Sequence, residues 1–276
     1  MTDIAVGVSV DVGDPAAFVE LARVAENAGL ESIWRGEHVM RPTEGFSGYP
    51  YGEGDHLSSY AILDPLQLAT AAGVATERVR IGVGVLLVPL WDTWLLARSL
   101  RTAALACRGR LVLGVGVGWS RQEFEVLGRS FGTRGRDTED RLVMLGDAMA
   151  TGVVQAEGRR GKLFDQGAGE PETPGIELIV GGDSTAALRR AKRFGGGWYG
   201  HHDDTAMLRE RLDSLDESLR VDPSGFTAGR RTIRVPGEVT RAQVSELAEL
   251  GFERVIVPLV RSADAAGAIA RIGAWL

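Results

Sequence analysis

The stretch AGLESIW, residues 28–34, contains the end of one element and the start of the next. Apolar residues at helical spacing precede it, Gly29 can end that helix in the left-handed conformation, and Ser-Ile-Trp suits a buried strand. Residues 250–257, LGFERVIV, repeat the order of helix end, glycine, glutamate and strand. The two segments predict a repeated unit in which helix and strand alternate.

Short runs rich in valine, isoleucine and leucine occur throughout the chain, and a helical pattern follows each of them. The predicted strands cover residues 4–10, 32–34, 78–85, 110–118, 176–180, 197–200, 231–235 and 254–260. Near-continuous aliphatic strands are typical of a parallel sheet that is buried on both faces, and eight such units close as a barrel. We therefore predict the α/β class and a (β/α)8 TIM barrel, with an open doubly wound sheet as the alternative.

Long loops interrupt the repeat at two places. We expect one domain over residues 1–276, with loop insertions near residues 36–61 and 152–175. The first of these loops is rich in glycine, proline and aromatic residues, and a loop of that length in a compact domain is usually functional or mobile. We expect it to cover the site as a lid.

The composition favours a small-molecule enzyme. The 276 residues are 44% hydrophobic and 25% charged, and the net charge of -6 with scattered basic residues argues against a nucleic-acid-binding surface. No uncharged apolar run reaches the roughly 18 residues of a spanning helix, and the N-terminus lacks the pattern of a signal peptide. The one cysteine, Cys107, cannot form an intramolecular disulfide. We expect a cytoplasmic protein that acts on a small molecule, without a nucleic-acid or membrane partner.

Glu37 and His38 directly follow the second predicted strand. In a parallel barrel, the active site is built from the C-terminal ends of the strands and the loops that follow them. An imidazole group has an unperturbed pKa near neutrality, which suits it to proton transfer. His38 is therefore the leading candidate for a catalytic residue, and the alternative is a structural histidine that hydrogen-bonds its own loop.

The segment VGGDSTAALRRAKRF, residues 180–194, connects a strand to a helix through two glycines. Glycine lets the backbone approach a ligand closely, and a helix N-terminus offers unpaired N–H groups to an anion. Gly181, Gly182 and Ser184 thus suggest a phosphate-binding turn. An ordinary strand-to-helix turn is the alternative.

Two other motifs do not support the functions that they first suggest. LGVGVGW, residues 113–119, is similar to a dinucleotide fingerprint, but Trp119 stands where that fingerprint needs glycine or alanine, so classical dinucleotide binding is excluded. His201 and His202 are adjacent and lack the ligand spacing of a metal site, so we expect no metal.

Taken in order, five segments resemble the bacterial luciferase-like superfamily of flavin and deazaflavin oxidoreductases, particularly its subgroup that depends on coenzyme F420. They are ESIWRGEHV (31–39), the run from YAILDPLQL to LLARSL (60–100), GRLVLGVGVGWSRQEFEVLG (109–128), RGRDTEDRLVML (134–145) and IVGGDSTAALRRAKRFGGGW (179–198). The resemblance implies a (β/α)8 barrel, usually a homodimer, that holds coenzyme F420, or alternatively FMN, at the C-terminal rim.

The resemblance also implies roles for particular residues. Glu37 and His38 would lie beside the cofactor ring, and a non-prolyl cis peptide at Gly84-Val85 would support the back face of the ring. The remaining cofactor-binding residues would lie after the fourth and fifth predicted strands, namely Gly116, Gly118 and Trp119 in the groove and Gly181, Gly182 and Ser184 at the phosphate. The chain differs from many relatives in having Glu37 where they have aspartate.

From the resemblance we expect an oxidoreductase that transfers a hydride between coenzyme F420 and an unidentified small organic substrate. His38 would donate or accept a proton or bind the substrate, and Glu37 would orient His38 or contact the cofactor. Three alternatives are open: a monooxygenase that uses reduced FMN, a non-catalytic flavin-binding protein, and a cofactor-free barrel lyase or isomerase. No basic trio suggests a sugar-phosphate substrate.

Overall fold

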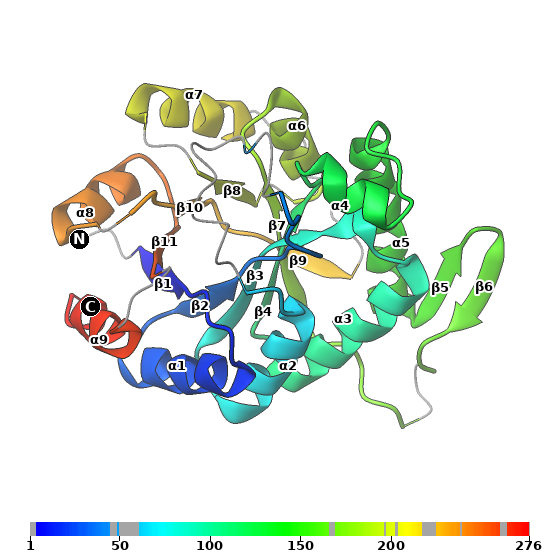
Figure 1. The fold of residues 1–276 in the computed structure, drawn as a ribbon, viewed down its shortest axis with the longest axis horizontal. Coiled ribbons are helices and arrows are strands. Elements are labelled where there is room, and N and C mark those ends of the chain that lie inside the picture. The colour runs from blue at the N-terminus through cyan, green and yellow to red at the C-terminus, as the bar shows by residue number, and fades with distance from the viewer. Residues whose placement is uncertain are drawn as a thin grey trace.

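Eight parallel strands form a closed barrel at the centre of the structure, and helices surround it (Figure 1). The computed structural model describes residues 4–44, 49, 61–165, 169–195, 197–201, 204–216, 225–237, 239–259 and 264–275. The barrel strands are β1 (Ala5–Ser9), β2 (Ser32–Arg35), β3 (Arg80–Leu87), β4 (Leu111–Gly116), β7 (Ile176–Gly181), β8 (Trp198–Gly200), β10 (Thr232–Arg234) and β11 (Arg254–Pro258). Because β11 pairs with β1 and β4 pairs with β7, the sheet closes, and the predicted (β/α)8 barrel is confirmed.

Helices cover the outside of the barrel (Figure 1). They are α1 (Pro15–Asn27), α2 (Pro65–Ala75), α3 (Thr93–Cys107), α4 (Arg121–Val126), α5 (Arg134–Thr151), α6 (Thr185–Arg193), α7 (Thr205–Asp216), α8 (Arg241–Glu249) and α9 (Ala265–Gly273), and a 3-10 turn, η2 (Val88–Leu90), precedes α3. Asp14, Asp64 and Asp92 accept backbone N–H groups at the starts of α1, α2 and α3. These N-caps satisfy free donors and fix where the helices begin.

The described part of the chain contains three further strands that were not predicted. β5 (Val153–Ala156) and β6 (Arg159–Lys162) form an antiparallel hairpin within the predicted insertion at 152–175. β9 (Phe226–Ala228) pairs in parallel with the first half of β7. The predicted lid at 36–61 falls largely outside the described residues.

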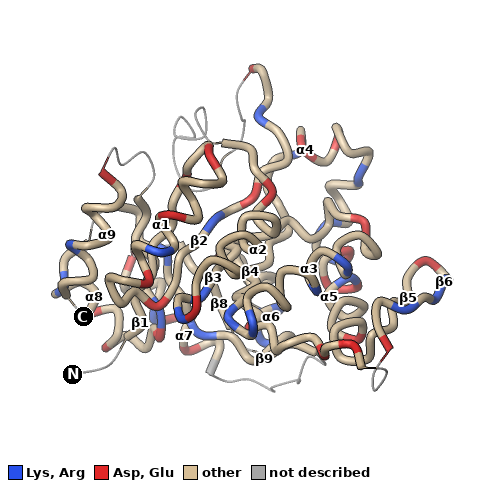
Figure 2. The backbone as a smooth tube through the Cα atoms, turned by 90° about the horizontal axis from the view of Figure 1, so that it is seen from below, with Lys and Arg blue, Asp and Glu red and all other residues tan. Residues whose placement is uncertain are grey.

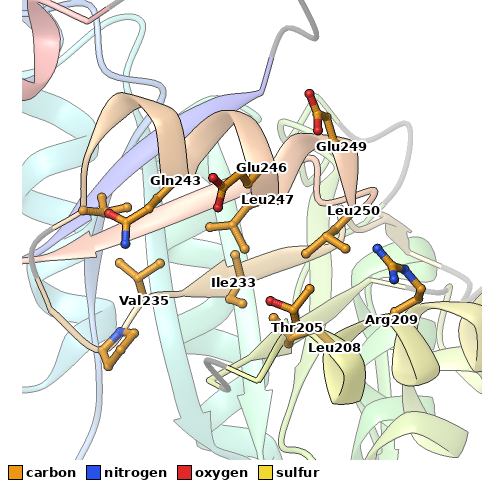
Figure 3. A pocket seen from close by; sticks show the side chains of 12 residues that line it. Thr205, Leu208, Arg209, Ile233, Val235, Gln243, Glu246, Leu247, Glu249 and Leu250 are labelled. Atoms are coloured by element: carbon orange, nitrogen blue, oxygen red, sulfur yellow. The ribbon is translucent and has the colours of Figure 1, made fainter.

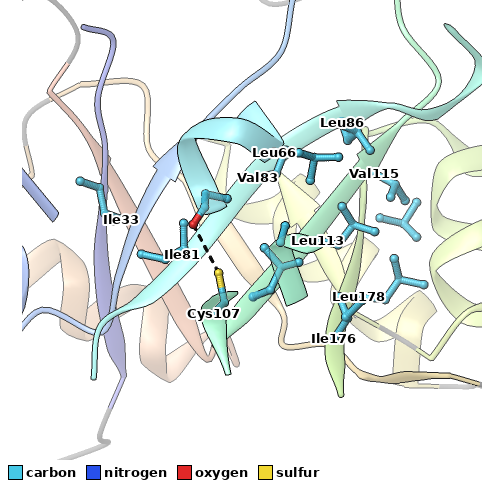
Figure 4. Close-up of a cluster of buried hydrophobic side chains, with 14 of the residues drawn as sticks. Ile33, Leu66, Ile81, Val83, Leu86, Cys107, Leu113, Val115, Ile176 and Leu178 are labelled. Carbon is cyan, nitrogen blue, oxygen red and sulfur yellow. Dashed lines mark hydrogen bonds between the residues drawn. The ribbon is translucent and has the colours of Figure 1, made fainter. Parts of the chain in front are cut away.

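The larger core lies between the barrel and its helices. Figure 4 shows Ile33 and Ile81 of neighbouring strands, Leu66 of α2 and Cys107 of α3 within this layer. Cys107 is fully buried, its Sγ donates to the carbonyl of Ala69 at 3.5 Å, and burial raises the pKa of the thiol to about 11. The cysteine therefore serves as a small core residue.

Trp34 fills the centre of the barrel. Its side chain is fully buried, and its Nε1 donates to Ser32 Oγ at 2.7 Å. Neighbouring strands leave room for the ring, because a Cβ on Gly82 would lie 2.1 Å from the Trp34 ring and one on Gly7 would lie 2.3 Å from Ser32 Oγ. Four more buried side chains complete this inner cluster: Val112, Ile179, Tyr199 and Ile256.

A buried ionic cluster fills the N-terminal end of the barrel, where the strands begin. Arg254 donates to the carboxylate of Glu31 at 2.9 and 2.6 Å and to that of Glu177 at 2.9 and 3.1 Å. Arg80 adds a contact of 2.9 Å to Glu177. Burial opposes the ionisation of Glu177, but the hydrogen bonds and charges of Arg254 and Arg80 outweigh it and lower the pKa. The cluster therefore holds its charges because each has a partner.

Acidic and basic residues are interspersed along the chain (Figure 2). Within the part of the chain that the structure describes, no helix has the length and apolar character needed to cross a membrane.

Replacing Arg254 with Met tests the ionic cluster. The change removes the shared partner of the buried Glu177 and the partly buried Glu31, so we expect the free energy of unfolding to fall by about 3–5 kcal/mol, as measured by urea denaturation. Arg23→Met is the control, because the Arg23–Glu20 pair lies at the surface with side chains 52% and 66% exposed. The control should change stability by less than about 1 kcal/mol, and equal losses in the two variants would contradict this account.

Candidate active site

The structure places the predicted site residues at the C-terminal end of the barrel. Glu37 and His38 follow β2, Gly84-Val85 lies in the second half of β3, and Gly116 and Gly181 are the last residues of β4 and β7. These elements are consecutive around the barrel. The predicted residues therefore lie on one rim, and the side-chain contacts show how that rim is built.

The peptide bond between Gly84 and Val85 is cis, as the resemblance implied. The side chain of Val85 lies between the ends of β4 and β7: a Cβ on Gly116 would be 2.5 Å from Val85 Cγ2, and one on Gly181 would be 2.7 Å from Val85 Cγ1. Both glycines are therefore needed to accommodate Val85. This packing explains why both positions are glycine, independently of any contact with a cofactor.

His38 is paired with Glu123, a residue that the sequence analysis did not single out. The Nδ1 atom of His38 lies 3.2 Å from both carboxylate oxygens of Glu123, which is 1% exposed in the first turn of α4. Glu123 also accepts the backbone N–H of Val39 at 2.6 Å. With Nδ1–H directed at a carboxylate, the Nε2 atom of His38 remains to accept or donate a proton.

Trp119 lies beside this pair. Its ring meets that of His38 edge to face with centroids 5.7 Å apart, and it meets Tyr49 in the same way at 5.2 Å. Gly118, which precedes it, has a φ of 78°, and a Cβ there would come within 3.0 Å of the Phe124 ring. A left-handed glycine thus turns the chain after β4 so that Trp119 lies next to His38.

Glu37 has different partners from those that the sequence suggested. Its Oε2 accepts the backbone N–H of Leu87 at 2.5 Å, and its Oε1 accepts from Trp91 Nε1 at 2.9 Å. The expectation that Glu37 orients His38 is therefore corrected, because the carboxylate in contact with His38 is Glu123. Burial raises the pKa of Glu37 to about 8, against the two hydrogen bonds that lower it.

The turn before α6 has the shape expected of an N-cap. Ser184 Oγ accepts the backbone N–H of Ala187 at 3.2 Å, and Gly182 has a φ of 113°. Asp183 lies 3.7 Å from Arg211 of α7. Contact between this turn and a phosphate group stays a prediction.

The side chain of Val85 connects the predicted site residues to one another through two hydrophobic clusters. Val85 packs against both the interior cluster of Trp34 and a second cluster formed by Leu87, Leu90 and Phe124, in which Val39 also takes part. These contacts join the cis peptide to the segments that carry His38 and Glu123. Among the described residues, no group of three or more histidine, cysteine or acidic side chains could hold a metal ion.

A cavity of about 620 Å³ lies away from this rim, between α7 and α8 (Figure 3). Ile233 and Val235 form its floor, and Leu208, Leu247 and Leu250 line its sides. Ile233 and Leu208 belong to the core layer between barrel and helices. The cavity therefore lies on the outer face of β10 and shares none of the predicted site residues.

Sequence comparison finds relatives over most of the chain. An uncharacterised protein of Mycobacterium tuberculosis is 28% identical over 208 residues, covering 74% of this chain and 72% of its own length. An F420-dependent glucose-6-phosphate dehydrogenase of Amycolatopsis mediterranei is 29% identical over 192 residues, covering 67% of this chain and 53% of its own length.

Solved structures share the fold at low sequence identity. The monooxygenase RslO1 of Streptomyces bottropensis has a TM-score of 0.73 at 14% identity, covering 99% of this chain and 98% of its own. An F420-dependent secondary alcohol dehydrogenase, solved with an F420–acetone adduct, has the same TM-score at 13% identity and the same coverage.

The match to a family model is the most extensive of these sequence findings. The model of the luciferase-like monooxygenases matches residues 1–236, which include every predicted site residue and Glu123. This match agrees with the closed barrel and with the position of the rim after β2, β3, β4 and β7, and it assigns the chain to a family. The protein belongs to the luciferase-like monooxygenase family.

Proposed function

We propose that the protein is an oxidoreductase that binds coenzyme F420 at the C-terminal rim and transfers a hydride between this deazaflavin and a small organic substrate. The observation that carries the proposal is the His38–Glu123 pair, because it places an oriented imidazole on the rim that holds the Gly84-Val85 cis peptide. The similarity to F420-dependent proteins supports the choice of cofactor. Assembly into a homodimer and a cytoplasmic location stay predictions.

The residues of the rim fit a flat ring system. Val85 fills the space that Gly116 and Gly181 leave open, so it presents an apolar surface between the ends of two strands. Trp119 and His38 add aromatic surface on the neighbouring side. Ligand sites of this kind are mostly apolar, with a few polar groups that fix orientation. Val85, Trp119 and the turn at Gly181-Gly182 would hold the ring and its phosphate.

The cofactor supplies the hydride chemistry when it is bound, and the protein supplies positioning and electrostatics. Glu123 accepts from Nδ1 of His38, which fixes the ring orientation and stabilises the imidazole when it carries a second proton. His38 can then hold a proton at Nε2 and pass it to the substrate, or remove one. Glu123 is buried, so its charge acts on His38 with little screening by solvent.

A monooxygenase that uses reduced FMN is the second candidate. The family description and the similarity to RslO1 favour it, since both name monooxygenases. The same rim would serve either cofactor, and the choice depends on affinity. The experiment that separates them is titration of the purified protein with F420 and with FMN, side by side.

We expect tighter binding of F420 than of FMN, together with consumption of reduced F420 when a panel of ketones, alcohols and enones is added. Tighter binding of FMN with oxygen consumption would support the monooxygenase instead. Cofactor binding without turnover on any panel member would favour a storage protein. Failure to bind either cofactor would contradict both proposals.

Replacing His38 with Ala tests its role in proton transfer. We expect kcat to fall by about 10²-fold or more, with little change in the Kd for F420, because general acid–base groups contribute on that scale. Glu123→Gln should also lower kcat while the His38 ring is retained. Added imidazole should restore part of the activity of His38→Ala but none of that of Glu123→Gln. Unchanged turnover in His38→Ala would contradict the assignment of His38 as the proton-transfer group.

We propose that Glu37 positions the segment from β3 to α3, since both of its oxygens are engaged there. Its pKa is raised from 4.5 to about 8 on folding, so the neutral carboxyl favours the folded state. This contribution is complete below the unfolded pKa and is lost as the pH rises through the folded one.

Urea denaturation of the wild type and Glu37→Gln, at about pH 5 and about pH 9, measures this effect. The wild type should lose more stability than the variant as the pH rises, because only the wild type has a carboxyl to ionise at this position. If the difference in unfolding free energy between the wild type and Glu37→Gln is the same at both pH values, the raised pKa of Glu37 is refuted.

A further inference from the structure

The side of the barrel mouth formed by β8 and β10 holds polar groups that the proposed chemistry does not use. Tyr199 lies in β8, and Arg234 is the last residue of the neighbouring β10. In the parallel pairing of these strands, Tyr199 is level with Thr232 and Gly200 with Ile233, which places His201 level with Arg234. Thr232 faces the barrel interior, where it accepts from Arg254, so Arg234, two residues later, lies on the same face.

The hydroxyl of Tyr199 is buried and has no hydrogen-bond partner among the residues that the structure describes. The residue is 1% exposed, and among the described residues its hydroxyl makes no hydrogen bond. The hydroxyl lies at the cis peptide, 3.2 Å from where a Cβ on Gly84 would stand. Trp34 lies on one side of the Tyr199 ring, with centroids 5.8 Å apart, and His201 on another, at 4.8 Å. A buried hydroxyl costs free energy unless a ligand or water satisfies it.

Arg234 is partly buried, and strand alternation puts its side chain on the interior face of β10. No carboxylate forms an ion pair with it within the described ranges of the chain. Its charge acts on Tyr199, His201 and Tyr49, and Tyr49 in turn contacts Trp119. Arg234 is therefore close enough to Tyr199 and His201 on one side, and to Tyr49 on the other, to act on them electrostatically. Burial lowers the pKa of His201 to about 3, so this histidine is neutral and does not compete for an anion.

We propose that Arg234 and Tyr199 form a subsite for the carboxylate of the substrate, with the Arg234 guanidinium pairing with the anion and the Tyr199 hydroxyl donating a hydrogen bond to it. The subsite rests on the proposed function for its role in turnover, since it would hold an acidic substrate beside the cis peptide. A bound carboxylate would give a partner both to the buried hydroxyl and to a guanidinium that pairs with no carboxylate of the described residues. The substrate class that it selects is a small organic acid.

Calorimetric titration of the cofactor-free protein with benzoate, and separately with benzyl alcohol, tests the subsite. We expect benzoate to bind more tightly than benzyl alcohol, and Arg234→Gln to weaken benzoate binding by roughly tenfold or more, because hydrogen bonds to charged groups are strong. Arg234→Lys should retain part of the affinity, and Tyr199→Phe should weaken it less than Arg234→Gln. Arg23→Gln, at an exposed position on α1, is the matched control and should bind as the wild type does.

Equal affinity for benzoate and benzyl alcohol, or equal benzoate affinity in Arg234→Gln and wild type with both folded by circular dichroism, would overturn the proposal. A repeat with saturating F420 separates the two claims. If F420 displaces benzoate in competition, the subsite belongs to the cofactor and the substrate assignment is wrong. If F420 and FMN both fail to bind while benzoate still depends on Arg234, the proposed function fails and the anion subsite stands.

Discussion

Arg254, at the start of the last barrel strand, shares its guanidinium between two carboxylates that reach it from either side of β11. Glu31 precedes β2 and Glu177 lies in β7, so one cation links segments that are 223 and 77 residues distant in the chain. The cluster lies beneath Trp34, whose ring centroid is 5.5 Å from the Arg254 guanidinium. Since an unpaired charge at this depth would be strongly unfavourable, the closed barrel and the ion pairs require each other.

In the barrel interior above this cluster, glycines on some strands pack against larger side chains on others. Gly82 and Gly7 make room for Trp34 and Ser32, and Gly116 and Gly181 make room for Val85 one level higher. Each of these four glycines lies against a larger side chain from another strand, as expected in a closely packed interior. The rim on which the candidate site lies is thus the top layer of a packed core, and its geometry is fixed from below.

Much of this could be predicted from the sequence because it depends on local pattern. The eight barrel strands, the helix N-caps and the rim at His38 follow from aliphatic runs, from aspartate before helices and from chain order. The cis peptide at Gly84-Val85 was expected from the resemblance.

The pairing of His38 with Glu123 could not be predicted, since the two residues are 85 positions apart in the chain and the sequence carries no local signal for side-chain direction. The position of Glu123 on the segment after β4 was a usable clue, because that segment was already expected at the rim. The expectation that Glu37 orients His38 was wrong because residues adjacent in an extended chain point their side chains in different directions.

The central claim is that the rim between His38, Trp119 and the Gly84-Val85 peptide is where the cofactor ring binds. A crystal structure of the protein with F420 tests it most directly. We predict the deazaflavin ring against Val85, with its phosphate near Gly182 and Ser184 and with His38 Nε2 facing the reacting side. A ring bound in the cavity between α7 and α8, or anywhere that leaves Val85 and His38 without contact, would contradict the account.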